Sequence, residues 1–542
     1  MSVKPDSEPT VLAFTAQGPL SPESRDPTYD VEKASADGST PVGSSLRSET
    51  DLDGEGETSG VWVKLDRWNS KLEDVLGLET RGIERVAEED QTDKRLWGNL
   101  LVWLAANCVL PTFGVGILGP LVFGMNLGDS MLTILFFNVF TAMIPAFMST
   151  FGPALGLRQM TSARYSWGYY GGKIVGLLAC IACVGWTIVN TISGTQTLVA
   201  VADWNLSPAA GTVIIAVLTL IVGFLGYRFV HRYESVSWIP TAISFLVLLG
   251  ISAKHLVSQP MQVGRAEAAS VLSFGGTVFG FAVGWSSLSS DYNVYMPASS
   301  KSWKVFLWTY TGLVFPLVLV MWLGAAIGSA AKANADWMAA YEEHELGGLL
   351  HAVFVPAMGG GGKFFMVLLV LSVVANNIVN VYSMGMSISV ISTYLARVPR
   401  LTWPIVITAI YIPLAIVGAD KFGTTLENFL NVLGYWLAIY VTIVLEEHLI
   451  FRKSDWARYD AANTWDRKEM LPWGLAAVAA GLCGWAGAVL GMAQVWYIGP
   501  LGKLVGGDAN PFGGDIGFEL AAGFSGIVFP PLRYLEKRYL GR

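Results

Sequence analysis

The sequence is divided into long apolar blocks, and their length constrains the fold more than any other feature. Of 542 residues, 53% are hydrophobic and only 14% carry a charge, and the apolar residues gather into runs of about 20. A helix of that length crosses a hydrocarbon core of about 30 Å, and a soluble protein of this size does not need so much apolar surface. We therefore predict an all-α integral membrane protein in a lipid bilayer.

Twelve such blocks follow one another, and we predict a membrane domain over residues 97–532. The blocks cover residues 97–123, 130–155, 172–201, 208–226, 236–253, 271–290, 304–331, 363–392, 403–418, 425–446, 472–494 and 516–532. Three blocks are short, so a count one higher or lower stays open. Polar residues 1–60 are predicted to be a disordered acidic cytoplasmic tail, residues 61–96 a cytoplasmic or interfacial segment, and residues 533–542 a short cytoplasmic tail.

The loops between the blocks differ in positive charge, which predicts the orientation of the chain. If the N-terminus is cytoplasmic, the inside loops and the C-terminal tail carry about three times as many Lys and Arg residues as the outside loops. Cytoplasmic loops are the ones enriched in these residues. We therefore expect both termini to lie in the cytoplasm.

Two blocks contain clusters of glycine at corresponding places. The first block includes FGVGILGP, with Gly114 and Gly116, and the sixth includes FGGTVFGFAVGW, with Gly280 and Gly284. Close helix packing is one explanation. The other is an inverted repeat of five plus five helices, followed by two extra helices, in which the first and sixth helices are broken. Matching interruptions of this kind point to the midplane site of a transporter, where unwound backbone contacts the substrate.

Charged side chains are scarce inside the blocks, and this excludes several classes of function. A redox or hydrolytic enzyme needs a buried cluster of His, Asp or Glu, so we expect no catalytic residues and no metal site. No basic groove is present that would bind nucleic acid. Cys180 and Cys183, spaced C-x-x-C inside an apolar block, are interpreted as packing residues. A charged substrate is also disfavoured, because charges at the midplane normally mark its path.

The side chains that do lie deep in the blocks are neutral, and they are polar or aromatic. The candidates for substrate binding are Trp186 and Asn190 in the third block, Trp285 and Ser286 in the sixth, and Asn376, Asn377 and Asn380 in the eighth. Amides both donate and accept hydrogen bonds, and indole faces stack on planar rings for about 1–3 kcal/mol per base. This chemistry suits a flat, uncharged, hydrogen-bonding solute.

Each of these residues also has a simpler interpretation. A single Trp near a block end is typical of an interfacial anchor, and a single Asn is typical of a hydrogen bond between helices. Three asparagines within VVANNIVNVYSMG are harder to explain in that way, because an unpaired buried amide costs a few kcal/mol. We expect the protein alone not to satisfy them, and their remaining partners to be the substrate or water.

Several motifs resemble those of fungal purine–cytosine permeases of the nucleobase–cation symporter family. They include LETRGIERVAEEDQTDKRLW before the first block, GLRQMTSARYSWGYYGG after the second, GWTIVNTISGTQ in the third, FGFAVGWSSLSSDYNVYMP in the sixth, ANNIVNVYS in the eighth and EEHLIFR after the tenth. The resemblance runs from about residue 78 to the C-terminus. It implies twelve helices with the five-plus-five repeat, alternating access, and cation-coupled uptake of cytosine, adenine, guanine or hypoxanthine at the plasma membrane.

The resemblance also assigns roles to individual residues. Trp186 and Asn190 match the substrate residues of the third helix, Asn376 and Asn377 match the amides of the eighth, and Trp285 falls where the sixth approaches the substrate ring. The family usually has proline where this chain has Val379. Losing that proline is expected to straighten the helix and re-aim Asn380. A vitamin B6-type solute or a nucleoside is therefore an alternative substrate. The N-terminal tail of about 95 residues leaves a non-transporting nutrient sensor as a further alternative.

The coupling ion is predicted to be a proton, and no other cofactor is expected. In this fold a sodium site would combine carbonyls of the first helix with hydroxyls of the eighth, and a hard cation needs several oxygens. The stretch LSVVA offers only Ser372. Asp291 is a candidate titrating group, although a helix cap or loop-end ion pair is the simpler interpretation. We expect the chain to function as a monomer.

Overall fold

The computed structural model describes residues 82–542, apart from 225–226, 262, 397, 399–401, 420 and 509. The chain divides into two units, Met1–Glu57 and Thr58–Arg542, and the described residues all belong to the second. The predictions for the acidic tail over residues 1–60, and for most of the segment 61–96, lie outside the described residues. The described chain is almost entirely helical.

Each of the twelve predicted blocks is helical in the structure. The corresponding helices are α2 (Leu96–Asn107) with α3 (Leu110–Leu121), α4 (Leu127–Thr141) with α5 (Met143–Met148) and α6 (Phe151–Leu155), α8 (Arg164–Val201), α9 (Pro208–Phe224), α10 (Tyr227–Ser252), α11 (Arg265–Val283), α12 (Ser302–Ala333), α14 (Gly360–Ile391), α16 (Thr402–Gly418), α17 (Phe422–Glu446), α19 (Leu475–Gly491) and α21 (Gly517–Leu540). Their apolar composition and length explain the agreement, because hydropathy alone specifies such helices.

Short elements connect these helices. They are η2 (Glu88–Asp90), α7 (Gln159–Ser162), η3 (Ala253–His255), η4 (Gly284–Ser287), η5 (Ser289–Tyr292), α13 (Ala335–Met358), α15 (Thr393–Ala396), the π-helical turn η6 (Glu447–Phe451), η7 (Trp456–Tyr459), α18 (Ala461–Thr464), strands β1 (Ala493–Gln494) and β2 (Tyr497–Ile498), and α20 (Pro500–Gly506). The strands form one antiparallel pair, with Ala493 opposite Ile498.

Length and composition support a multi-pass membrane protein. Within the described residues, seven helices are long and apolar enough to cross a bilayer, or eight when the bent pair α2 and α3 is one span. Three further apolar helices, α9, α16 and α19, are shorter. The number of twelve spans remains a prediction, since α21 and these shorter helices do not meet the same test.

The packing of the helices follows the predicted inverted repeat. If the first five spans correspond to the next five, the contact of α11 with α4 corresponds to the contact of α12 with α2 and α3, and both are present. The contacts of α8 with α16 and α17 likewise correspond to those of α14 with α9 and α10. The related helices α8 and α14 pack against each other along much of their length. This pairing places the third and eighth spans at the centre.

The breaks in the first and sixth spans are present, but not at most of the predicted glycines. The first span bends by 55° between α2 and α3, at Cys108 and Val109. Gly114 and Gly116 lie inside α3 and are helical. They serve packing: a Cβ on Gly116 would lie 2.0 Å from the Met321 carbonyl oxygen. The simpler interpretation, close helix approach, is therefore correct for both.

The sixth span changes course where α11 ends at Val283. Gly284 then begins the 3-10 turn η4, Leu288 leaves the helical region at φ −143°, and η5 follows. Gly280 lies inside α11, where a Cβ would lie 2.0 Å from the Leu430 carbonyl oxygen. Only Gly284 of the four predicted glycines is therefore at a break.

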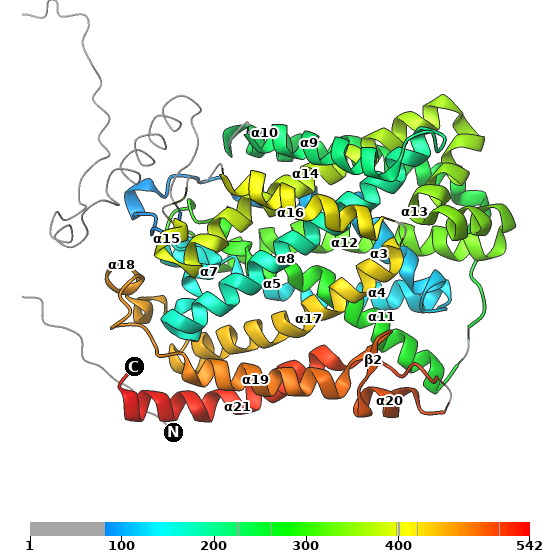
Figure 1. Cartoon of the computed structure of the whole chain (residues 1–542). Coiled ribbons are helices and arrows are strands. Elements are labelled where there is room, and N and C mark those ends of the chain that lie inside the picture. Colours follow the sequence, from blue (N-terminus) through cyan, green and yellow to red (C-terminus); the bar gives the residue numbers. More distant parts are fainter. Residues whose placement is uncertain are drawn as a thin grey trace, which may run out of the picture. The chain divides into compact units, whose positions relative to one another are not determined.

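The last two helices pack beside one another along one edge of the bundle (Figure 1). The connecting elements lie at two opposite ends of the bundle: α7, α15, α18 and the C-terminus at one end, and α13 and α20 at the other (Figure 1). This arrangement is compatible with the prediction that α7, α15, α18 and the C-terminus are cytoplasmic. A buried ion network joins α21 to η6, with Arg533 contacting Glu447 at 2.9 Å and Glu536 at 2.9 Å.

The helix α13 was not expected, because its sequence lies between two apolar blocks and carries several charges. Asn334 caps it by accepting from the backbone N–H groups of Asp336 and Trp337. The helix kinks at His344 and Glu345, and Glu345 has φ 52°. The segment between the seventh and eighth spans is therefore an ordered helical pair rather than an open loop.

Candidate substrate-binding site

The two predicted tryptophans lie together at the break in the sixth span. Trp186 on α8 and Trp285 on η4 are nearly parallel, with ring centroids 6.4 Å apart and an angle of 10° between planes. Phe281 and Phe429 pack edge-on against Trp186 at 5.0 and 5.3 Å. Gly284 packs closely beside them, since a Cβ there would lie 3.1 Å from the Trp186 ring, which would have to shift by a few tenths of an ångström. The tertiary structure thus brings two distant tryptophans into one aromatic pair.

The four predicted asparagines form one hydrogen-bonded network between α8 and α14. The Asn190 amide nitrogen donates to the side-chain oxygens of Asn376 at 2.7 Å and Asn377 at 3.0 Å. The Asn377 nitrogen donates to Thr191 Oγ1 at 3.1 Å, and the Asn380 nitrogen donates to Asn376 Oδ1 at 3.1 Å. All four are buried.

This network corrects the expectation that the protein alone does not satisfy the amides. The side-chain oxygen and nitrogen of Asn377 are both hydrogen-bonded to residues of α8. The Asn376 nitrogen donates to the carbonyl of Ala106 at the end of α2, at 2.6 Å. Within the described chain, no donor reaches the Oδ1 atoms of Asn190 and Asn380. The amides are therefore mainly held by each other, and two acceptors remain available beside the network.

The end of α2 joins the aromatic pair to the break in the first span. Trp285 Nε1 donates to Asn107 Oδ1 at 2.8 Å, and the Asn107 amide donates to the Trp103 carbonyl at 2.8 Å. Trp103 meets Trp285 and Tyr292 edge-on, at 5.5 and 5.6 Å. Asn107, Trp103 and Tyr292 were not among the residues predicted from the sequence. The only available signal was that an Asn and a Trp lie four residues apart near a predicted break.

Ser286, a predicted contact, does not present its hydroxyl to the site. It donates to the Val283 carbonyl at 2.6 Å, while Ser287 and Ser289 donate to the carbonyls of Gly284 and Trp285. Breaking a helix leaves carbonyls without their usual partners, and serine hydroxyls satisfy them locally. The run of serines therefore stabilises the break.

Helix α14 passes through the asparagines without interruption. No residue between Gly360 and Ile391 departs from helical geometry, as expected where Val379 replaces proline. The Val379 carbonyl accepts from the Tyr292 hydroxyl at 3.3 Å, and the same hydroxyl lies 3.1 Å from Ser383 Oγ. The sixth span is thus tied to the eighth just beyond Asn380.

Ser372 connects the break in the first span to α14. Its hydroxyl accepts from the Leu110 N–H at 3.2 Å and donates to the Leu369 carbonyl at 2.6 Å. The next side chains along α14 are Val373 and Val374. At this junction, therefore, α14 contributes the Ser372 hydroxyl, and that hydroxyl already forms two hydrogen bonds.

Asp291 is a helix cap in the structure. It is buried, and its Oδ1 accepts from the Gln159 backbone N–H at 2.9 Å, at the start of α7. Gln159 in turn accepts from Ser290 Oγ at 2.8 Å and donates to the Tyr440 hydroxyl at 3.0 Å. The simpler interpretation of Asp291 therefore has structural support. Within the described residues, no group of three or more His, Cys, Asp or Glu could hold a metal ion.

Together, a packing pattern with inverted symmetry, two broken spans and a neutral aromatic-amide centre define the chain as a membrane transporter. A family model described as permease for cytosine/purines, uracil, thiamine and allantoin matches residues 86–509. The chain belongs to this family.

Individual relatives agree over most of the chain. It is 42% identical to the purine-cytosine permease fcyB of Emericella nidulans, over 91% of this chain and 96% of the relative. It is 41% identical to the purine-cytosine permease FCY2 of Saccharomyces cerevisiae, over 88% and 89%. The vitamin B6 transporter TPN1 of the same yeast is 32% identical, over 88% and 90%.

Solved structures show the same fold at low sequence identity. Mhp1, a nucleobase-cation-symport-1 family transporter in a closed conformation with bromovinylhydantoin bound, superposes with a TM-score of 0.60 at 14% identity, over 86% of this chain and 96% of that one. Its inward-facing conformation gives 0.61 at 13% identity, over 85% and 96%. The fold class predicted from the sequence is confirmed.

Proposed function

We propose that this protein is a secondary active transporter that takes up neutral nucleobases, namely cytosine, adenine, guanine and hypoxanthine, together with a proton. The observation that carries the proposal is the parallel pair Trp186 and Trp285 beside the amide network. A flat ring held between two others needs about 7 Å, twice a contact distance of about 3.5 Å. The centroid separation of 6.4 Å is below that value, so the two indoles have to move apart slightly to accept a ring between them.

The amides supply the hydrogen-bonding part of the proposal. A base bound between the indoles has N–H donors at its edge, and the Oδ1 atoms of Asn190 and Asn380 are the acceptors left available by the network. Asn376 and Asn377 hold Asn190 in place from α14. Such preorganised amides favour a ring with mixed donors and acceptors over an apolar ring.

Alternating access is proposed to act through the two breaks. Trp285 lies on η4 and is hydrogen-bonded to Asn107, the last residue of α2, so that the aromatic pair touches both interrupted spans. A rotation of those spans relative to α8 and α14 would therefore open or close the tryptophan pair. The bond between Ser372 and Leu110 and that between Asn376 and Ala106 are the contacts that would have to change.

A proton is proposed as the coupling ion because the junction of the first and eighth spans has few oxygens for a metal. The Ser372 hydroxyl already accepts a hydrogen bond from the Leu110 N–H. The next two residues of α14 are valines, whose side chains carry no oxygen. Hard cations need several oxygen ligands. Monomeric function, a plasma-membrane location, cytoplasmic termini and the absence of enzymatic activity belong to the same proposal, which the distribution of Lys and Arg and the membership of a permease family support.

Uptake of labelled bases tests the proposal. Yeast lacking its own carriers would express the wild type, Asn377→Ala and the control Asn463→Ala, which changes an exposed asparagine at α18. Saturable uptake of cytosine or adenine that falls with an uncoupler, is lost in Asn377→Ala and is retained in Asn463→Ala is the expected result. Sodium-dependent uptake would contradict the choice of ion. Binding without uptake would indicate a sensor.

A second substrate class has one observation in its favour. Val379 leaves α14 unbroken, and a vitamin B6 transporter is among the relatives. Labelled pyridoxine therefore belongs in the same assay. Uptake of pyridoxine without any nucleobase would assign the site to a substituted pyridine and overturn the nucleobase proposal.

A further inference from the structure

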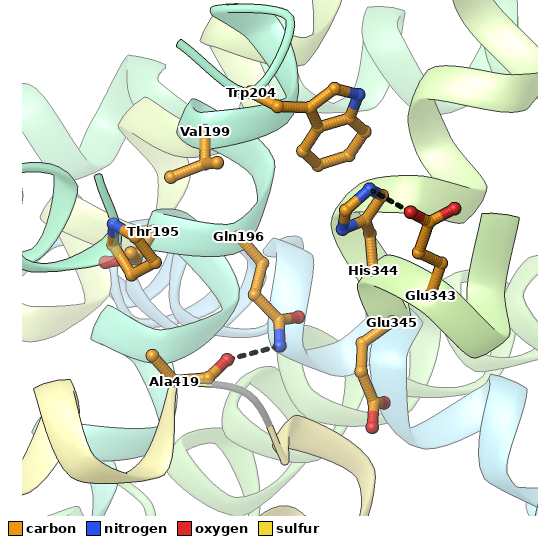
Figure 2. Close-up of a pocket in the computed structure, with 9 residues that line it drawn as sticks. Thr195, Gln196, Val199, Trp204, Glu343, His344, Glu345 and Ala419 are labelled. Atoms are coloured by element: carbon orange, nitrogen blue, oxygen red, sulfur yellow. Dashed lines mark hydrogen bonds and ion pairs between the residues drawn. The ribbon is translucent and has the colours of Figure 1, made fainter. Parts of the chain in front are cut away.

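A separate cavity lies at the C-terminal end of α8, beyond the tryptophan pair. It has a volume of about 170 Å³. Its lining comes from α8, from the start of α9, from the kink of α13 and from the turn before α17, and comprises Thr195, Gln196, Val199, Trp204, Pro208, Glu343, His344, Glu345 and Ala419 (Figure 2). Gln196 is six residues from Asn190, so the two sites are about 9 Å apart along the helix axis.

The cavity contains a buried hydrogen-bond acceptor without a partner. Gln196 is 9% exposed, and its Nε2 donates to the Ala419 carbonyl at 2.7 Å. That bond fixes the orientation of the amide, because only the nitrogen can donate to a carbonyl. Its Oε1 is fully buried and accepts no hydrogen bond from the described residues. Figure 2 shows this oxygen on the side of His344 and Glu345. An unpaired buried acceptor is costly, which favours a ligand with a donor.

The wall of the cavity is aromatic and is held in an unusual backbone conformation. Trp204 stacks on His344 with ring centroids 3.7 Å apart and an angle of 18°. Asp203 and Trp204 have φ values of 48° and 65°, and Glu345, which follows His344 in the chain, has 52°. Left-handed backbone at residues other than glycine costs about 1–2 kcal/mol each, and such strain clusters at ligand sites. Asp203 is bound by Lys363 and by His351, and these contacts hold the turn.

The polar groups around the cavity are mainly acceptors. Glu343 contributes a carboxylate that also contacts His344 Nε2 at 3.5 Å, and Glu345 contributes one that also accepts from the Gly423 N–H at 3.4 Å. Gln196 contributes its free amide oxygen. The nearby side chains of Lys363 and His351 contact Asp203. A ligand for this lining needs a flat face for the aromatic wall and N–H donors for the oxygens.

We propose that this cavity is a second, distal binding site for a planar heterocycle with an exocyclic amino group, such as an aminopurine or aminopyrimidine. The choice of ligand class rests on the proposed function, because the same solutes would occupy the tryptophan pair further along α8. The two sites then bind one molecule each. The distal site does not depend on Trp186, and the tryptophan pair does not depend on Gln196.

Equilibrium binding of radiolabelled adenine to the purified full-length protein in nanodiscs tests this proposal. We expect two molecules of adenine per chain at saturation in the wild type. Gln196→Leu and Trp204→Ala should each bind one, and so should Trp186→Ala. Gln196→Glu keeps an acceptor oxygen and should retain more distal binding than Gln196→Leu. Trp496→Ala changes an exposed tryptophan elsewhere and should bind two.

The outcomes separate the two proposals. One adenine per wild-type chain, unchanged in Gln196→Leu and Trp204→Ala, would overturn the distal site and leave the tryptophan pair intact. One adenine that is lost in Gln196→Leu but kept in Trp186→Ala would support the distal site and reject the tryptophan pair as the adenine site. No adenine bound by the wild type would overturn the ligand class assigned to the cavity.

Discussion

Asn377 is completely buried, and its two hydrogen-bonding ends both contact α8. One of its partners, Thr191, belongs to the motif GWTIVNTISGTQ, but nothing in that motif distinguishes its hydroxyl from that of Thr187. Thr187 donates only within its own helix, to the Cys183 carbonyl at 2.8 Å. The difference between these two threonines arises from the packing of α8 on α14.

Replacing the two threonines by valine should therefore have different effects. Thr191→Val leaves the Asn377 nitrogen without its acceptor and should lower the free energy of unfolding by about 1–3 kcal/mol. Thr187→Val removes only a bond to its own helix and should change it much less. Thermal unfolding of the two purified variants compares them directly. Equal losses of stability would contradict the role given to Thr191.

Glu345 predicts a dependence of stability on pH. Burial raises the pKa of its carboxyl above 4.5, and a hydrogen bond from the Gly423 N–H opposes that shift. A raised pKa in the folded state means that the stability from this group is present below pH 4.5 and lost as pH rises through the shifted value. Glu345→Gln should thus unfold at a higher temperature than the wild type at pH 7. The two should agree below pH 4.5.

The matched control for this experiment is Glu342→Gln, which changes an exposed carboxylate on the same helix. It should leave the difference in melting temperature between the two pH values unchanged. A wild type that melts at a higher temperature than Glu345→Gln at pH 7 would contradict this prediction. It would show that the hydrogen bond from the Gly423 N–H outweighs the effect of burial on the Glu345 pKa.

At the scale of the elements, glycine marks close helix approach more often than a break. The bend between α2 and α3 falls at Cys108 and Val109, whereas Gly116 faces the Met321 backbone. Gly116→Ala would place a Cβ 2.0 Å from that carbonyl oxygen, which no change of rotamer relieves. We expect a loss of more than about 1–3 kcal/mol and reduced surface abundance.

Gly250→Ala is the control, because a Cβ there meets nothing within 4 Å. It should keep or slightly raise stability, since alanine favours a helix by about 1 kcal/mol in comparison with glycine. Fluorescence-detected size-exclusion after heating would measure both variants. Wild-type behaviour of Gly116→Ala would indicate that α3 and α12 separate more easily than their packing suggests.

Substituting Val379 by proline would test whether the straightness of α14 affects substrate choice. Val379→Pro removes a backbone donor and costs about 3 kcal/mol in a soluble helix, although membrane helices tolerate proline better. The bend should move Asn380 and loosen the bond between Tyr292 and the Val379 carbonyl. We expect an altered ratio of cytosine to pyridoxine uptake at matched surface expression. Val379→Ala, which keeps the donor, should preserve the wild-type ratio.

Across the whole molecule, one buried ion network fixes the extra helices to the repeat. Arg533 and Glu447 are each 1% exposed, and Glu536 also accepts from the Leu475 N–H at the start of α19. Arg533→Met would remove the arginine that both buried carboxylates share, while Glu447 keeps its contact with Arg452 and Glu536 keeps its bond from the Leu475 N–H. We expect a loss of about 3 kcal/mol, the lower end of the range for a broken buried ion pair. The melting temperature of the purified protein reports it.

The triple variant Arg533→Met, Glu447→Gln and Glu536→Gln should recover much of this loss, because neutral amides replace the unpaired charges. Recovery would attribute the loss to charge burial. A triple variant as unstable as Arg533→Met alone would instead show that the shape of the arginine side chain is what α21 requires.

The sequence by itself determined the class of protein and the twelve helical segments, because hydropathy is a local property. It also named candidate tryptophans and asparagines that the structure brings together. It also predicted an unbroken α14 from Val379, since the presence of a backbone N–H is decided by one residue. It did not locate the breaks at Cys108 or Leu288, or the helix α13. Those depend on which backbone approaches which.

Tertiary structure alone decided what each polar group does. The sequence placed Asn190, Asn376, Asn377 and Asn380 near one another, but only the packing of α8 on α14 shows that they bond mainly to each other. The structure likewise shows that Ser286 donates to the Val283 carbonyl at the break in its own span, and that Gln196 Oε1 lies unpaired in a cavity. Hydrogen bonds are directional and short, so their partners follow from three-dimensional proximity and not from residue type.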